Sequence, residues 1–276
     1  AGFDATPEHP VARIVAYEKT ANGWNPTDKI IYRPLHQLSQ IEKPKASDVP
    51  VISMRKKDEN KVGEIAVYSD IGPEWWGGVS SQMFKKELDQ LNGVQRLEIR
   101  INSGGGDAFE GLAMHNMIKQ FKADEKIAYV DALCASAATV VALGAQKISM
   151  AEESWFMVHR SATIAIGNVN DFEAVLDLLR KVDQQLIRIY NAKTNLGEPK
   201  VEELIDKETW MTSKEAIDNG FVDEITATPE ARVAASLSRK WFKNPPQALA
   251  STVEPSGYEA KLREKVAQQV SRLNVS

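Results

Sequence analysis

The stretch that decides the fold runs from residue 129 to residue 143 and reads Tyr-Val-Asp-Ala-Leu-Cys-Ala-Ser-Ala-Ala-Thr-Val-Val-Ala-Leu. Its first half is an apolar run rich in β-forming residues, and the small residues that follow suit the start of a packed helix. This change places Ser136 at a strand-to-helix turn. The first N–H groups of a helix have no partner inside it and the helix dipole favours negative charge, so an oxyanion formed on a substrate beside Ser136 would be stabilised.

A glycine loop precedes this stretch, since residues 101–107 read Ile-Asn-Ser-Gly-Gly-Gly-Asp. The loop lacks the Gly-Lys-Ser/Thr sequence of a phosphate-binding loop and the third glycine of a dinucleotide-binding loop, so phosphate binding is disfavoured. Two interpretations stay open. The loop is a tight turn in which only glycine tolerates a positive φ, or its exposed N–H groups line an oxyanion site and pair with an extended peptide.

A histidine follows the stretch, at the end of the apolar run Trp-Phe-Met-Val-His that occupies residues 155–159. Residues 160–167 are predicted to be flexible, which would expose His159 as a catalytic or substrate-contacting group; a lone histidine at such a place also fits a structural role. The alternating segment 160–168 could pair with an extended substrate as an added strand.

Other potentially reactive side chains receive structural interpretations. His9 and His36 lie in an irregular N-terminal region, and His115 is expected at a surface or an interface. Cys134 could compete as a nucleophile, but its apolar neighbours favour a small buried hydrophobe. No cluster of His, Cys and carboxylate residues has the spacing of zinc ligands.

Composition sets the class of protein. The chain has 276 residues, 43% of them hydrophobic and 26% charged, which suffices for one sizeable core with appendages. A formal net charge of −4 argues against nucleic acid or an anionic membrane as the main partner. There is no apolar run of membrane-spanning length and no signal-like start, so a soluble, cytoplasmic protein is expected. A single cysteine is compatible with a reducing cytoplasm.

Three regions are predicted along the chain. Residues 1–60 form an N-terminal arm or accessory segment with strands at 11–17 and 29–32, and residues 229–276 form a flexible basic extension with a short helical pattern at 258–273. Between them, residues 61–228 alternate strands and helices, which favours a largely parallel α/β sheet with functional loops at the strand ends. The predicted strands are 64–68, 97–102, 127–132, 147–150 and 155–159, and the predicted helices are 79–91, 108–121, 137–143, 170–192 and one between 212 and 220.

The helix at 170–192 is expected to be long, amphipathic and packed along one broad apolar face. Leu178, Ile187 and Tyr190 lie off the strict apolar stripe, which suggests that another subunit covers a second face. Thr212 and Glu215 have the spacing of a capping box, so a further helix is predicted to begin there.

Several ordered motifs together carry a family resemblance. They are Ile-Asn-Ser-Gly-Gly-Gly-Asp-Ala-Phe-Glu-Gly-Leu-Ala (101–113), Ala-Leu-Cys-Ala-Ser-Ala-Ala (132–138), Phe-Met-Val-His (156–159), Asp-Lys-Glu-Thr-Trp-Met-Thr-Ser-Lys-Glu-Ala (206–216) and Asn-Gly-Phe-Val-Asp-Glu-Ile (219–225). The region 63–225 resembles the Clp peptidase proteolytic-subunit family (ClpP), and more closely its phage branch, the head maturation or prohead proteases. The loop Gly-Pro-Glu-Trp-Trp-Gly-Gly (72–78) also resembles that branch.

The resemblance implies a ClpP/crotonase-like fold of repeated β-β-α units arranged as a superhelix, with an N-terminal arm and a C-terminal extension. It implies a serine peptidase in which Ser136 is the nucleophile and His159 the general base. Gap-free alignment from His159 places Glu208 where the family carries its catalytic aspartate, and Asp206, the alternative third member, needs a two-residue shift. Glu208 is favoured.

By the same resemblance, the backbone N–H groups of Gly106 and Ala137 would form the oxyanion hole. Two positions depart from the family pattern. Gly104 stands where proline is usual, which should loosen the loop, and Ala137 replaces a usual methionine, which leaves more room beside the nucleophile.

The implied activity is hydrolysis of peptide bonds through an acyl-enzyme, with phage capsid or scaffold proteins as substrates during head maturation. This mechanism requires no metal and no organic cofactor. A homo-oligomeric ring is expected, an ATP-driven unfoldase is a candidate partner, and the location would be the host cytoplasm or a procapsid. Two alternatives stay open: an acyl-CoA enzyme of the crotonase type, and a catalytically inactive assembly scaffold.

Overall fold

The structure is a computed structural model of the 276-residue chain. It describes residues 52–73, 78–163, 165, 168–227 and 246, together with the backbone of two strands in the N-terminal region. Several predictions lie outside these residues: those for His9, His36, the middle of the 72–78 loop and, apart from residue 246, the extension at 229–276 with its helical pattern.

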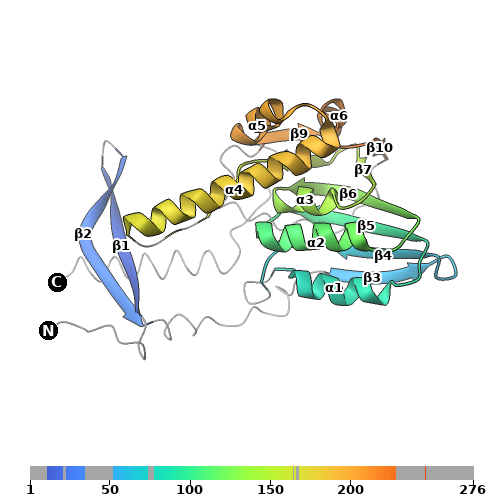
Figure 1. The fold of residues 1–276 in the computed structure, drawn as a ribbon, viewed down its shortest axis with the longest axis horizontal. Helices are drawn as coiled ribbons and strands as arrows, with labels where there is room; N and C mark the ends of the chain where they lie inside the picture. Colours follow the sequence, from blue (N-terminus) through green and yellow to red (C-terminus); the bar gives the residue numbers. More distant parts are fainter. Residues whose placement is uncertain are drawn as a thin grey trace.

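A largely parallel sheet forms the centre of the described part (Figure 1). Its strands are β3 (Ile52–Lys57), β4 (Val62–Val67), β5 (Arg96–Ser103), β6 (Glu125–Ala135), β7 (Lys147–Ala151), β8 (Trp155–Val158), β9 (Thr209–Thr212) and β10 (Glu224–Thr226). The order is β10-β7-β6-β5-β4-β3, with β8 beside β6 and β9 beside β8. The pairs from β10 to β4 and the β6–β8 pair are parallel, and β3 and β9 pair antiparallel with their neighbours. The prediction of a largely parallel α/β sheet is therefore confirmed.

Helices cover one face of this sheet. They are α1 (Ser81–Gln90), α2 (Ala108–Gln120) and α3 (Ala137–Ala142), followed along the chain by α4 (Val169–Thr194), α5 (Glu198–Asp206) and α6 (Ser213–Asp218). Figure 1 shows α1, α2 and α3 side by side on that face. Asp107 caps α2 by accepting hydrogen bonds from the N–H groups of Phe109 and Glu110, and Thr212 and Glu215 form the predicted capping box of α6.

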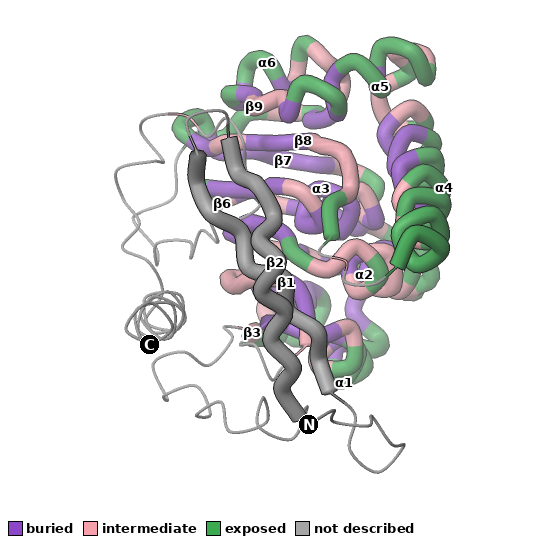
Figure 2. Tube along the Cα trace, turned by 90° about the vertical axis from the view of Figure 1, so that its left-hand side faces the viewer, coloured by how far each residue is buried: buried purple, intermediate pink, exposed green. Residues whose placement is uncertain are grey.

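The core lies between this helical layer and the sheet, where the strands are largely buried (Figure 2). Alternate residues of β5, namely Leu97, Ile99 and Ile101, point into it and are almost completely buried. Phe84 and Leu88 meet them from α1. Each such side chain contributes about 1.5–3 kcal/mol by leaving water, which fixes the helices against the sheet.

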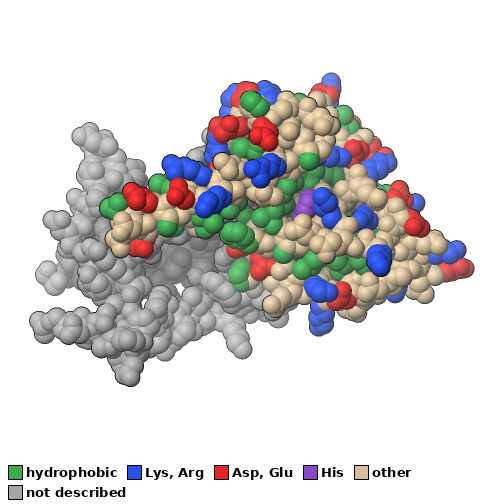
Figure 3. Space-filling model, in the orientation of Figure 1, with side chains coloured by type: hydrophobic (Ala, Val, Ile, Leu, Met, Phe, Trp, Pro, Cys, Tyr) green, Lys and Arg blue, Asp and Glu red, His purple; other side chains and the backbone are tan. Residues whose placement is uncertain are grey.

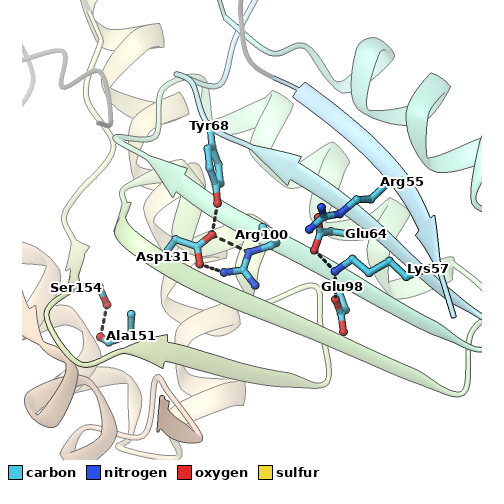
Figure 4. Close-up of polar contacts among 9 residues, drawn as sticks. All are labelled: Arg55, Lys57, Glu64, Tyr68, Glu98, Arg100, Asp131, Ala151 and Ser154. Carbon is cyan, nitrogen blue, oxygen red and sulfur yellow. Dashed lines mark hydrogen bonds and ion pairs between the residues drawn. The ribbon is translucent and has the colours of Figure 1, made fainter. Parts of the chain in front are cut away.

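The opposite face of the sheet carries paired charges (Figure 4). Asp131 on β6 accepts hydrogen bonds from the Tyr68 hydroxyl and from Arg100 Nε, the latter at 2.9 Å. Burial and the neighbouring Asp131 raise the pKa of Tyr68 to about 12, so the hydroxyl keeps its proton. Further along this face Lys57 bridges Glu98 at 3.1 Å. These partners offset the cost of partly burying the charged side chains on this face.

Four described elements, β3, α5, β9 and β10, escaped the sequence analysis. Strand β3 lies within the predicted arm 1–60 but pairs with β4, so the sheet begins before residue 61. Helix α5 lies almost wholly in a stretch for which nothing was predicted, and strands β9 and β10 lie in stretches that were given only as motifs. Pro199 at the start of α5 was a usable signal, because proline suits the first turn of a helix. The predicted strands 11–17 and 29–32 lie within β1 (Val11–Thr20) and β2 (Gly23–Pro34), an antiparallel pair.

Helix α4 differs from its prediction. Only its C-terminal half is packed, and Ile187 and Tyr190, expected to face another subunit, are buried in the core of this chain. Its N-terminal half reaches beyond the sheet and exposes apolar side chains, among them Phe172 at 47% and Leu176 at 50%. Figure 3 shows hydrophobic side chains also gathered on the face between α4 and the sheet's helices.

Candidate active site

Ser136 occupies the predicted turn between strand and helix. It follows the last residue of β6, precedes the first residue of α3, and has φ 55° and ψ −127°, a backbone conformation that non-glycine residues rarely adopt. Such a conformation costs on the order of 1–3 kcal/mol and persists only where the surroundings enforce it. Here the Ser136 N–H donates to the Met157 carbonyl at 2.9 Å, and the Ser136 carbonyl accepts from the Thr139 N–H at 2.9 Å. The strained turn exposes the hydroxyl at the end of the sheet.

The histidine reaches this hydroxyl because β6 pairs with two different strands along its length. Its first half pairs with β7, and its last three residues pair with β8, where Ala135 lies opposite Met157. His159 comes two residues after Met157, at the end of β8. Nε2 of His159 lies 2.7 Å from Oγ of Ser136, and both residues are half-buried. The imidazole can therefore accept the hydroxyl proton directly.

The glycine loop packs against the same turn. Ser103 lies opposite Cys134 in the β5–β6 pair, so the loop that follows reaches Ser136. A Cβ atom on Gly105 would lie 2.5 Å from the Ala135 carbonyl oxygen and 2.6 Å from Ser136 Cβ, and Gly105 has φ 92°. No other residue fits there. The tight-turn interpretation of the loop is therefore confirmed, and the contact also places its N–H groups beside the serine.

The two predicted oxyanion donors are the backbone N–H groups of Ala137 and Gly106. Ala137 is the first residue of α3, so its N–H has no partner within the helix. Gly106 is exposed and forms a parallel bridge with Ile71 in which the flanking residues make the hydrogen bonds, from Ile71 N–H to the Gly105 carbonyl and from Asp107 N–H to the Ile71 carbonyl. In a parallel bridge the N–H of the bridging residue points away from the paired strand, so the Gly106 N–H points away from Ile71.

The two candidate acids have different surroundings. Asp206 ends α5, has a half-exposed side chain, and is paired with Arg160, which holds the pKa of that carboxyl below its usual value. Glu208 is buried, with φ 51°, and accepts a hydrogen bond from Trp210 Nε1 at 3.3 Å. The β8–β9 register pairs Val158 with Thr209, and one further step puts Glu208 opposite His159.

A hydroxyl relay that the sequence analysis missed supports the nucleophile turn. Thr139 Oγ1 donates to the Ser136 carbonyl at 2.6 Å and lies 2.7 Å from the hydroxyl of Tyr190 on α4. Since the threonine has one proton, Tyr190 is the donor in the second bond. Burial raises the pKa of Tyr190, so this donor stays protonated. The only signal in the sequence was a threonine three residues after the serine.

The segment after His159 is anchored where flexibility was predicted. Arg160 donates its backbone N–H to the Ile205 carbonyl at 3.2 Å, and Ser161 donates both its N–H, at 2.7 Å, and its hydroxyl, at 2.6 Å, to Asp183. The prediction was therefore wrong for residues 160 and 161. The polar partners that hold them come from α4 and α5, far along the chain, which local sequence does not reveal.

His115 is also placed differently from its prediction. It is buried between α2 and α3, with Nδ1 2.9 Å from the Val140 carbonyl, and burial lowers its pKa. Cys134 is completely buried, and burial raises the pKa of its thiol, which removes it as a competing nucleophile. In the described part of the chain no group of three or more His, Cys, Asp and Glu side chains could hold a metal ion. Nor is any helix there long and apolar enough to cross a membrane.

Comparison with known families now places the chain. The family model for Clp protease matches residues 59–229, more than half of the sequence. The chain belongs to the Clp protease family. The predicted resemblance to ClpP and the prediction of a serine peptidase are thereby confirmed, and the Clp protease match favours this activity over the acyl-CoA alternative.

Individual relatives of the Clp protease family agree. The ATP-dependent Clp protease proteolytic subunit of Deinococcus radiodurans is 26% identical over 139 residues, which cover 50% of this chain and 68% of that protein. The corresponding subunit 2 of Treponema denticola is 27% identical over 140 residues, covering 50% and 70%. The subunit of Bacteroides thetaiotaomicron is 27% identical over 139 residues, covering 50% of this chain and only 63% of that protein, so less than two thirds of it is matched.

A solved structure shares the fold of the Clp protease domain. A ClpP1 mutant from Listeria monocytogenes superposes with a TM-score of 0.53 at 22% identity, covering 61% of this chain and 92% of that one. The predicted ClpP/crotonase-like fold is therefore confirmed. The roles of the individual residues rest on the geometry of this chain.

The contact between Gly105 and the serine turn can be tested with a matched glycine. Gly93 also has a positive φ, 88°, but a Cβ there would meet nothing within 4 Å. Gly93→Ala should cost about 1–2 kcal/mol of unfolding free energy from backbone strain alone. Gly105→Ala should cost about 1–3 kcal/mol more because of overpacking, and should also slow fluorophosphonate labelling of Ser136. Urea unfolding and labelling rates measure both; equal losses in the two variants would show that the contact is unimportant.

Proposed function

We propose that Ser136, His159 and Glu208 form the catalytic triad of this serine peptidase and that it cleaves peptide bonds through an acyl-enzyme. The observation that carries the proposal is the 2.7 Å contact between Ser136 Oγ and His159 Nε2 at the end of the sheet. A neutral serine hydroxyl is a poor nucleophile until a base removes its proton, and this contact supplies the base.

The reaction follows from this contact. Ser136 Oγ attacks the substrate carbonyl carbon as its proton passes to His159 Nε2, giving a tetrahedral oxyanion. His159 returns the proton to the leaving amine as the peptide bond breaks, which leaves an acyl ester on Ser136. Water, deprotonated by the same imidazole, then attacks the ester and restores the serine. The N–H groups of Gly106 and Ala137 are proposed to stabilise the oxyanion in both steps.

Glu208 is proposed as the third member. A carboxylate opposite His159 would accept a hydrogen bond from the N–H of the second ring nitrogen, Nδ1, so that Nε2 is free to act as the base. The register and the burial of Glu208 support this assignment. Asp206 is engaged instead by Arg160, which orients it toward the exposed side of α5.

Replacing Ser136 by alanine tests the nucleophile. Ser136→Ala should remove hydrolysis of a casein or peptide substrate and labelling by a fluorophosphonate probe, because only an activated serine reacts with that probe. Thermal stability and oligomer mass should remain those of the parent, since the change deletes one half-exposed hydroxyl. Retained cleavage by a folded Ser136→Ala variant would remove Ser136 from the role.

The third member can be assigned with a pair of isosteric amides. Glu208→Gln should lower kcat by roughly 10³- to 10⁴-fold, the loss expected when the acid that orients the imidazole becomes neutral. Asp206→Asn keeps an oxygen that accepts from Arg160 and removes one exposed charge pair, so its kcat should fall by less than about tenfold. The two kcat values on a single peptide substrate decide the matter, and the reverse ranking would assign Asp206.

A homo-oligomeric ring is proposed as the active assembly. The support is the N-terminal half of α4, which exposes Val169, Phe172, Leu176 and Leu178 at 47–71% in the single chain. Apolar side chains gathered on one element are typical of a surface that another subunit covers. An ATP-driven unfoldase remains a candidate partner of such an assembly.

Phage capsid or scaffold proteins are the proposed substrates, on the basis of the resemblance of the 72–78 loop and the ordered motifs to the phage branch. Co-expression with a phage capsid protein and its scaffold protein should shorten one of them, and the Ser136→Ala variant should leave both intact. Intact mass spectrometry measures this directly. Unchanged masses with the unmodified enzyme would favour the scaffold alternative if labelling also fails, and a different substrate if labelling succeeds.

A further inference from the structure

Next to His159 lies a charged cluster that the proposed chemistry does not use. The Arg160 guanidinium contacts three carboxylates on two helices: Asp206 through Nε, Glu202 through a terminal nitrogen at 2.8 Å, and Asp183 through the other at 3.1 Å. These contacts, with Asp206 first, raise the pKa of Arg160 above its usual value, so the side chain stays charged.

Asp183 is the buried member of the cluster. It lies on α4 with 6% of its surface exposed, and its carboxylate accepts three hydrogen bonds, from Arg160, the Ser161 N–H and the Ser161 hydroxyl. A buried carboxylate is stable only while its partners are in place. The cluster therefore fixes residues 160 and 161 against α4 and α5, in contrast to surface ion pairs that contribute little.

One carbonyl joins this anchor to the proposed acid. The Ile205 oxygen accepts hydrogen bonds from the Arg160 N–H and from the Glu208 N–H, both at 3.2 Å. Arg160, which follows the proposed base, and Glu208, the proposed acid, therefore donate to the same carbonyl oxygen. His159 is held on its N-terminal side by the β8–β9 pairing and on its C-terminal side by this anchor.

We propose that Arg160, acting through Asp183, is a positioning residue that fixes the backbone of His159 and so keeps the imidazole against Ser136 Oγ. The inference rests on the proposed function, because it assigns a role relative to that base. A displacement of about 1 Å in a catalytic group can cost about 100-fold in rate, so loss of the anchor should appear in kcat.

The charges around His159 give a second, independent readout. The groups near it on the packed elements are Arg160 on its own segment, Glu208 before β9, Asp206 and Glu202 on α5, Asp183 on α4, and the neutral Ser136 before α3. Arg160 is the only cation of this cluster. Its removal leaves the carboxylates unopposed, which favours the imidazolium, so the acid limb of the pH profile should move to higher pH.

Arg160→Gln is the main test. It should lower kcat by about 10- to 100-fold with KM changed less than about twofold, slow fluorophosphonate labelling in parallel, and move the acid limb of the kcat/KM profile up by about half a pH unit. Arg160→Lys keeps the charge but cannot reach three carboxylates, so it should leave the acid limb in place and recover only part of kcat. Arg96→Gln is the matched control, because Arg96 forms an exposed ion pair with Glu125 at the start of β5, the end of that strand away from Ser103, and it should change neither quantity.

The outcomes separate this inference from the proposed function. If the parent enzyme labels at Ser136 and folded Arg160→Gln keeps its kcat within about twofold, the positioning role is wrong while the triad stands. A lower melting temperature with unchanged kcat would likewise leave Arg160 as a stability residue only. If Arg160→Gln does not fold, Asp183→Asn replaces it and must show the same loss of kcat at nearly constant KM. Retained hydrolysis in Ser136→Ala would instead overturn the triad itself.

Discussion

The change of partner along β6 is the constraint on which the site depends. A strand that stayed beside β7 to its end would leave Ser136 next to the wrong neighbour, because β7 ends at Ala151 and leads away into a turn. Instead the last three residues of β6 pair with β8, and the Ser136 N–H donates to Met157. The β5–β6 and β6–β8 registers then bring the glycine loop, Ser136 and His159 together, and the β8–β9 register pairs Val158 with Thr209, the residues next to His159 and Glu208.

The turn at Ser136 is held in place by hydrogen bonds from the elements packed around it. The strained Ser136 backbone is held by the Met157 carbonyl on one side and by the Tyr190–Thr139 relay on the other. Tyr190 reaches the relay from α4, where it is buried against the Phe221 ring at 5.7 Å. The packed half of α4 therefore supports the turn at Ser136 through Tyr190 and Thr139, and the segment after His159 through Asp183, whereas its other half exposes apolar side chains.

Much of this arrangement could be predicted from sequence because it depends on local patterns. The abrupt change around Ser136, the glycine run and the alternation of strands and helices each have a local physical cause, and the structure places them as predicted. The predictions failed where a distant partner decides the outcome. Arg160 looked mobile because its carboxylates lie 23 to 46 residues away, and His115 looked exposed because the α3 carbonyl that buries it is 25 residues away.

The proposed use of Glu208 in place of the family's usual aspartate has a local physical account. Glu208 has a left-handed φ of 51° directly after α5, and its N–H turns back to the Ile205 carbonyl, so the backbone there is tied to the helix end. A side chain longer by one methylene can extend from a backbone held in that position, and Trp210 orients its carboxylate by donating from Nε1. The same Ile205 oxygen also accepts a hydrogen bond from the Arg160 N–H, so the backbone at Glu208 and the backbone after His159 are held by one carbonyl. In the proposed triad a shorter acid on the same backbone would reach less far towards the imidazole. Helix α5 therefore fixes two parts of the proposed site at once, because its Ile205 carbonyl holds both the Glu208 turn and the Arg160 backbone.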